Sequence, residues 1–315
     1  MRSRRVVFVY FDGCEVLDFA GPLQAFHEAN SFGAKYCIEH CATAPQATTN
    51  QGLRLCDLAP LPDVTTEDLV MIPGFTVQDV HLPQSLIRWL KKSYDQGAAM
   101  SSVCTGAFAL AQAGLLHNRR CTTHWKRTAE LQKLYPRANV LADRLFVDDG
   151  RIITSAGIAA GIDMTLALIQ RHHGPLVAAK VAREMVVYMR RDAHHRQQSV
   201  YLDYRTHLHP GVHSAQDWLT SHPDKKASIK DLAKIAHMSA RNLTRAFREV
   251  TGVSIQTYRT RLRLEHAGTL MNNPEFTLEA IAAECGFADG RQFRRVWRKA
   301  YQSPPSRTRQ SSLSD

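Results

Sequence analysis

The chain has 315 residues, with 40 Lys and Arg against 29 Asp and Glu and a net charge of +11 when its histidines are neutral. This length predicts about two domains, each with its own core. The seven cysteines are an odd number without paired CxxC spacing, which argues against a disulfide framework and a paired-cysteine zinc site and predicts a reducing cytoplasm. The apolar run at residues 6–11 is too short for a secretory signal, and no apolar stretch is long enough to span a membrane.

Residues 5–190 alternate short β-branched runs with helical stretches, which is typical of an α/β sandwich with a mainly parallel sheet. Strands are predicted at 5–11, 35–41, 68–72, 98–103 and 151–154. Helices are predicted at 21–31, 82–96, 105–113, 124–135 and 159–173, and from Pro175 to about residue 191. Gly174 ends the helix before Pro175, and the Asp149-Gly150 pair predicts a hairpin.

A cysteine lies at an abrupt turn between a predicted strand and a predicted helix. The strand ends at Val103, and Cys104, Thr105 and Gly106 form the turn. A small residue at Gly106 lets the helix pack closely while the thiol points out above the sheet, which is the geometry of a nucleophile elbow. The helix N-terminus is expected to favour the thiolate. A buried, inert cysteine is the alternative interpretation.

Three other segments place polar or glycine residues after strands or at helix starts, where open α/β sheets bind ligands. Taken singly, each has a structural explanation as a helix cap, a turn or a capped polar residue. Taken together with the cysteine turn, they predict a ligand pocket. Its members are Asp18, Gly74, Phe75, Cys104, Thr105, His124 and Trp125.

The polar stretch 194–213 breaks both periodicities and is predicted to be a linker between domains at 1–193 and 214–315. His207 and His209 lie within it without regular ligand spacing, which favours solvated histidines over a metal site. The first helix of the second domain is predicted at 214–221. No cofactor and no metal are predicted.

Residues 228–309 contain the same apolar pattern twice. Positions from Ile229 to Met238 match later positions at an offset of 49, and after one extra residue in the second turn Leu243 and Phe247 match at an offset of 50. Each copy predicts a short helix, a tight turn and a second helix with Ser239 or Asp289 as its N-cap. This is the helix-turn-helix arrangement, whose second helix lies in the DNA major groove.

The second helix of each copy carries side chains that can form bidentate hydrogen bonds to guanine or adenine. With the two caps, the predicted DNA-binding residues are Ser239, Arg241, Asn242, Arg245, Asp289, Arg291, Gln292, Arg294 and Arg295. Residues 221–309 hold 17 Lys and Arg against 8 Asp and Glu, whereas the rest of the chain holds 23 against 21. This excess is what phosphate binding requires, and a helical bundle with a solvated basic face is the alternative.

Residues 215–309 resemble the DNA-binding domain of the AraC/XylS family of bacterial transcription regulators. The resemblance implies a long joining helix at about 255–271 and a motif closing each unit, at 252–259 and 302–309. Ile255, Gln302 and Thr308 depart from the usual Pro, Gly and Tyr of that motif and leave the ends of the units open.

Residues 5–190 resemble the ThiJ/PfpI branch of the class I glutamine amidotransferase-like superfamily, and the whole chain resembles the GlxA-type regulators that join the two domains. A flavodoxin-like fold is implied. Cys104 and Asp18 most resemble the cysteine and the acid, respectively, of isonitrile hydratases, with His124 as a third pocket residue. Phe75 replaces the usual second Gly, whose backbone N–H helps to form an anion site, so its side chain is expected to fill part of the pocket and to favour sensing over catalysis.

The sequence therefore predicts a cytoplasmic, homodimeric transcription regulator, with activation favoured over repression. Its first domain is expected to sense a small metabolite such as an amino acid, a betaine or another nitrogen compound. Its second domain is expected to bind promoter DNA and to act with RNA polymerase. Two alternatives stay open: an isonitrile hydratase-like or amidase-like cysteine enzyme that carries a DNA-binding domain, and a thiol redox sensor.

Overall fold

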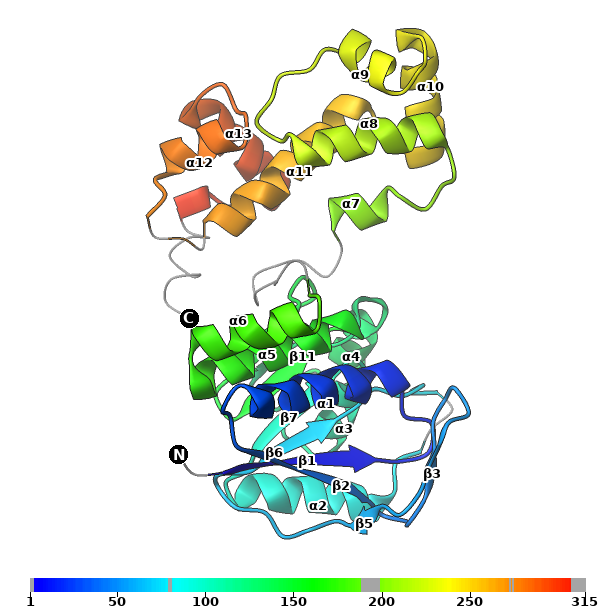
Figure 1. The fold of residues 1–315 in the computed structure, drawn as a ribbon, viewed down its shortest axis with the longest axis vertical. Helices are drawn as coiled ribbons and strands as arrows, with labels where there is room; N and C mark the ends of the chain where they lie inside the picture. The colour runs from blue at the N-terminus through cyan, green and yellow to red at the C-terminus, as the bar shows by residue number, and fades with distance from the viewer. Residues whose placement is uncertain (1–2, 79–80, 188–198, 272, 274, 307–315) are drawn as a thin grey trace. The chain divides into compact units, whose positions relative to one another are not determined.

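The computed structural model describes residues 3–78, 81–187, 199–271, 273 and 275–306. The chain forms two compact units, Met1–Gln197 and Gln198–Asp315. The first unit is a sheet covered by helices on both faces, and the described part of the second unit is helical (Figure 1). The predicted fold class, a flavodoxin-like α/β unit followed by an all-α unit, is confirmed. No helix within the described ranges is long and apolar enough to cross a membrane.

The sheet of the first unit has seven strands over the described residues, in the order β10-β11-β7-β6-β1-β2-β5. Its strands are β1 (Arg4–Tyr10), β2 (Tyr36–Ala42), β5 (Ala59–Pro60), β6 (Leu69–Ile72), β7 (Ala99–Val103), β10 (Phe146–Asp149) and β11 (Ile152–Ser155). Neighbours are parallel except for β10 and β11, which form the predicted hairpin across Gly150. Two further pairs, β3 (Ala47–Thr48) with β4 (Arg54–Leu55) and β8 (Arg120–Cys121) with β9 (Asn139–Val140), escaped prediction because two-residue strands show no alternation.

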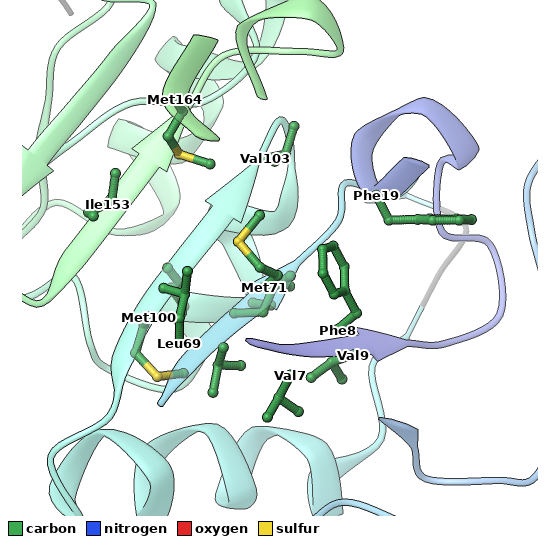
Figure 2. Close-up of a cluster of buried hydrophobic side chains, with 14 of the residues drawn as sticks. Val7, Phe8, Val9, Phe19, Leu69, Met71, Met100, Val103, Ile153 and Met164 are labelled. Atoms are coloured by element: carbon green, nitrogen blue, oxygen red, sulfur yellow. The ribbon is translucent and has the colours of Figure 1, made fainter. Parts of the chain in front are cut away.

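The helices of the first unit pack on the two faces of this sheet. They are α1 (Val16–Ser31), α2 (Gln84–Asp95), α3 (Gly106–Gln112), η1 (Trp125–Arg127), α4 (Thr128–Leu134), α5 (Ala159–His173) and α6 (Pro175–Glu184). Helices α1, α5 and α6 contact one another, and α2 contacts α3 (Figure 1). Figure 2 shows why both faces are covered: Val7 and Val9 of β1 project to one side, and Phe8 projects to the other side, toward Phe19 of α1.

Two helix ends differ from the prediction. Helix α1 begins at Val16 rather than at residue 21, because Asp18 in its first turn is held by amides from other segments and Pro22 removes only one backbone hydrogen bond from the helix. Helix α6 ends at Glu184 instead of near residue 191, because Val186 adopts a left-handed backbone with φ of 54°. The predicted residues 188–191 lie outside the described ranges.

The second unit contains two small cores joined by one helix. Its helices are α7 (Val200–Asp203), α8 (Pro210–Ser221), α9 (Ile229–Ile235), α10 (Ala240–Thr251), α11 (Ile255–Leu270), α12 (Leu278–Glu284) and α13 (Gly290–Tyr301). Helix α11 places Tyr258 in the first core and Leu264 in the second. The predicted joining helix is therefore present with nearly the predicted bounds.

The predicted linker at 194–213 is not an irregular segment from residue 199 onward. Helix α7 packs against α11, where the backbone N–H of Val200 donates to the Glu265 carboxylate at 2.8 Å. Helix α8 begins at Pro210, four residues before the predicted start, and His209 caps it by accepting the Val212 N–H at 3.3 Å. The polar residues that break the periodicity are thus partly the residues that start a helix. Residues 194–198 lie outside the described part of the chain.

Candidate functional site

Cys104 directly follows β7 and has a left-handed backbone conformation, with φ of 56°, which a non-glycine residue rarely adopts. Its N–H donates to the Ser155 carbonyl at 3.0 Å, and its carbonyl accepts the Thr123 hydroxyl at 2.8 Å. A Cβ on the following Gly106 would lie 2.6 Å from the Ile72 carbonyl oxygen, so only glycine permits this approach of α3. The predicted strand, abrupt turn and helix are confirmed.

Asp18 lies directly behind the cysteine and is 1% exposed. Its Oδ2 accepts the Gly74 N–H at 3.1 Å and its Oδ1 accepts the Ile158 N–H at 3.0 Å, while the Cys104 side chain is within hydrogen-bonding reach. Burial raises the pKa of Asp18 to about 6, because the two amides and Cys104 offset only part of the desolvation of the carboxylate. The carboxylate is therefore largely ionised at pH 7.

The expectation of a Cys104 thiolate is wrong. Burial raises the pKa of the Cys104 thiol far above its ordinary value, and the negative charge of Asp18 raises it further. Hydrogen bonds from the backbone and the side chain of Thr105 lower the pKa, but they do not offset these two effects. The sulfur is thus a neutral thiol at pH 7, suited to donating a hydrogen bond to the carboxylate.

Phe75 does not behave as the sequence predicted. Its N–H donates to the Thr105 hydroxyl oxygen at 2.7 Å, and that hydroxyl donates to the Phe75 carbonyl at 2.6 Å. Its ring packs edge-on against Phe11, with centroids 5.5 Å apart. The backbone N–H of Phe75 is therefore not available to an anion, because it is bonded to Thr105. The Phe75 ring lies against Phe11 and does not fill the cavity beside His124.

A cavity of about 220 Å³ opens beside the cysteine. It is lined by His124, Trp125, Leu145, Ala156, Gly157, Ile158, Ala159 and Ala160. A Cβ on Gly157 would lie 2.6 Å from His124 Cδ2 and 3.5 Å from the Cys104 sulfur, so Cys104 lies next to the cavity wall formed by Gly157. Of the predicted pocket residues, His124 and Trp125 line the cavity, Cys104 borders it, and the other four lie behind and support them.

Residues 156–160 are the functional candidates that sequence reasoning missed. They follow β11 at its carboxyl end, the same position that selected Asp18, Gly74 and Cys104. Their side chains are small or aliphatic, so the segment carries no chemical signal. The only sequence feature that could have pointed to this segment is its run of small residues directly after a strand.

His124 supplies the polar group of the cavity. Burial lowers the pKa of its imidazole, and the charges of Lys126 and Arg127 lower it further, so the ring is neutral at pH 7. Its Nδ1 accepts the Lys126 N–H at 3.4 Å, which places the ring proton on Nε2, the nitrogen nearest Gly157. Trp125 is 44% exposed beside it. The cavity therefore offers an apolar wall, an aromatic rim and an N–H donor.

The second unit presents a separate, basic surface. Ser239 caps α10 by accepting the Asn242 N–H at 3.2 Å, and Asp289 caps α13 by accepting the Gln292 N–H at 2.6 Å, as predicted. Leu243 and Phe293 point inward at 0% exposure. The outward side chains Arg241, Asn242, Arg245, Arg291 and Arg295 are exposed.

Besides the caps Ser239 and Asp289, two of the predicted DNA-binding residues make side-chain contacts inside the second unit. Gln292 accepts the Ala288 N–H through Oε1 at 2.7 Å, and Arg294 pairs with Glu279 of α12 at 2.8 Å. At the C-terminus of α13, Gln302 takes the left-handed conformation, with φ of 54°, that Gly252 takes after α10. Gln302 thus fills the place of the usual glycine.

Comparison with known proteins agrees with this geometry. The DJ-1/PfpI family model matches residues 4–171, more than half of the chain, and a helix-turn-helix domain model matches residues 232–311. The chain belongs to the DJ-1/PfpI family. Both parts of the predicted resemblance, this domain and an AraC-type helix-turn-helix domain, are confirmed.

The relatives include regulators and an enzyme. The HTH-type transcriptional regulator CdhR of Pseudomonas aeruginosa is 29% identical over 96% of this chain and 90% of its own length. An isonitrile hydratase of Pseudomonas putida is 29% identical over 53% of this chain and 71% of its own length. The crystal structure of an AraC family transcriptional regulator from Pseudomonas putida shares the fold, with a TM-score of 0.52 at 20% identity over 58% of this chain and 99% of that chain. This member of the DJ-1/PfpI family is an HTH-type transcription regulator that binds DNA.

Proposed function

We propose that this regulator responds to a small metabolite bound beside Cys104. The cavity lined by His124 and Trp125 is the observation that carries the proposal, because its polar group is a neutral imidazole and the neighbouring Cys104 is a neutral thiol, so no strong nucleophile is present. A small molecule with an apolar part and a hydrogen-bond acceptor for His124 Nε2 fits this lining. Amino acids, betaines and other small nitrogen compounds are the classes to screen first.

The ligand acts on DNA binding only if it binds two arrangements of the protein with different affinity. We place the sensing domain at 1–193 and the DNA-binding domain at 214–315. Dimerisation of the first domain would set two DNA-binding domains on repeated half-sites. The regulator works in the cytoplasm, with promoter DNA and RNA polymerase as partners, and activation is favoured over repression.

A thermal-shift screen of the full chain tests the ligand site, since a ligand of the folded state raises the melting temperature by mass action. Ala159→Leu fills the cavity from an exposed position, and Ala179→Leu on the exposed side of α6 is the matched control. A true effector stabilises the wild type and Ala179→Leu, fails to stabilise Ala159→Leu, and changes the affinity for DNA. A compound that stabilises both variants equally binds elsewhere and refutes the assignment.

An active cysteine enzyme is the second candidate, favoured by the similarity to an isonitrile hydratase and by the strained backbone of Cys104. The raised pKa of the thiol and the occupied N–H of Phe75 speak against it. The test is turnover of isocyanide substrates by the full chain and by Cys104→Ala. Turnover that depends on the cysteine would establish the enzyme and reject a purely sensory pocket.

A further inference from the structure

The turns of the two helix-turn-helix units differ in length by one residue. Up to Met238 and Phe287 the units correspond at an offset of 49, and from the caps Ser239 and Asp289 onward they correspond at an offset of 50. Ala288 is the residue without a counterpart. Its backbone N–H is an additional donor in the turn, and it lies at an exposed position.

Gln292 provides an acceptor for this N–H. Its side-chain oxygen takes the Ala288 N–H at 2.7 Å, and its own backbone N–H is held by Asp289 at 2.6 Å. These two hydrogen bonds connect the turn to the first turn of α13, in an arrangement similar to a capping box. In the first unit the equivalent residue is Asn242, whose backbone N–H is held by Ser239 while its side chain is exposed. The two amides at equivalent positions therefore have different surroundings.

A second contact is present only on the side of α13. Arg294 pairs with Glu279 of α12 at 2.8 Å, whereas the equivalent residues of the first unit are Thr244 and Lys230, which cannot form an ion pair. Gly290 leaves room for this pair, since a Cβ there would lie 3.2 Å from Glu279 Oε1. The first unit has Ala240 at that place. The Arg294–Glu279 ion pair and the Gln292 amide therefore hold the start of α13 against α12 and the preceding turn, and Gly290 leaves space for the ion pair.

We propose that Gln292 and Arg294 are positioning residues, and that Asn242 is the side-chain amide that specifies a base. A side-chain amide specifies adenine in a bidentate pair: its NH₂ donates to N7, and its oxygen accepts from the N6 amino group, so both amide groups must be free. The oxygen of Gln292 is already bound, and the side chain of Asn242 is exposed. The second unit then contacts DNA through Arg291 and Arg295. This inference rests on the proposed DNA-binding surface and adds which of its residues read the sequence.

Selection of binding sites from a randomised double-stranded DNA library tests the proposal without knowledge of the promoter. The full chain is compared with Asn242→Ala and Gln292→Ala. We expect Asn242→Ala to lose the preference at one base position and to keep the others. Gln292→Ala should keep every base preference and lose affinity by about threefold to tenfold for all sequences alike, because one hydrogen bond that positions the start of α13 is lost to water. Loss of a base preference in Gln292→Ala, or none in Asn242→Ala, overturns the proposal.

Gln292→Glu separates positioning from readout even if Gln292→Ala folds poorly. A carboxylate still accepts the Ala288 N–H, but it cannot donate to a base. Unchanged base preferences in Gln292→Glu, with a uniform loss from the added charge, support positioning, and a changed preference at any position refutes it. Failure of the wild-type chain to select any sequence would refute the DNA-binding surface itself, which is a different outcome.

Discussion

The pocket beside Cys104 and the surface of α10 use their polar groups in opposite ways. In the pocket, Asp18 binds two backbone amides from distant segments, and the hydroxyl of Thr105 binds both backbone groups of Phe75. On α10, the side chains of Arg241 and Arg245 extend into solvent. One region is preorganised by internal bonds, and the other leaves its donors for an outside partner.

This difference predicts how each region responds to change. Substitutions around Cys104 alter internal bonds and close packing, so they act first on folding stability. Substitutions on α10 remove exposed side chains, so they leave stability nearly unchanged and act on DNA binding.

Gly74→Val should cost the most. A Cβ on Gly74 would lie 2.8 Å from Cys104 Cβ and 2.9 Å from the Thr105 hydroxyl, and it would overlap the Asp18 carboxylate. We expect a loss of at least about 3 kcal/mol from overpacking and from the broken Asp18 bond. Urea unfolding followed by circular dichroism measures it. Gly268→Ala in α11, which meets only Trp297 at 3.8 Å, is the tolerated control; equal stability of both variants would contradict the close packing.

The stability of the first unit should fall as pH rises through 6. The folded-state pKa of Asp18 is raised from 3.8 to about 6, so the folded protein binds a proton more tightly than the unfolded chain. The resulting stabilisation is complete below about pH 4 and is lost as pH rises past 6, a change of about 3 kcal/mol. Asp18→Asn leaves one amide without an acceptor at every pH and has no carboxyl to titrate.

The difference in unfolding free energy between the wild type and Asp18→Asn, measured from pH 4 to pH 7, isolates this contribution. Asp12→Asn, at an exposed carboxylate, controls for the general effect of charge. A difference that stays constant across the range would show that Asp18 is not destabilised by burial.

The patterns that predicted this molecule correctly are those that repeat along the chain. The matching apolar positions of the two units, such as Leu243 with Phe293, predicted the helix-turn-helix units because helix packing fixes such spacing. Cys104 was placed at a turn because a strand pattern stops there and small residues follow. Local order of this kind is contained in the sequence itself.

The details of both sites depend on contacts between distant segments. Asp18 meets Gly74 and Ile158 across 56 and 140 residues of sequence, and these contacts and the burial around Cys104 reversed the expected ionisation of the thiol. The bond from Ala288 to Gln292 spans only four residues, yet it depends on the rotamer of one side chain. No periodicity reports the contacts of such groups, so the sequence assigned Gln292 to DNA from its residue type and its place on the second helix.

Arg241→Ala and Arg291→Ala should each weaken specific DNA binding by about 1 to 3 kcal/mol. Both arginines are exposed on recognition helices and can form bidentate bonds to guanine. Fluorescence anisotropy with a selected DNA site at several salt concentrations measures the loss. The unfolding free energies of both variants should match that of the wild type within about 0.5 kcal/mol. Undiminished binding by the double variant would reject these helices as the recognition surface.

The smallest expected effect is on the reactivity of Cys104. Only the thiolate attacks an alkylating agent or peroxide, and burial together with Asp18 keeps this thiol protonated at pH 7. Brief iodoacetamide or peroxide treatment followed by peptide mass spectrometry should modify the exposed Cys37 and Cys56 and leave Cys104 unchanged. Asp18→Asn removes one of the two causes of the raised pKa, so it should speed modification of Cys104 while Cys37 keeps its rate. Faster modification of Cys104 than of Cys37 in the wild type would contradict the neutral thiol, and it would favour a redox or catalytic role over a preorganised ligand pocket.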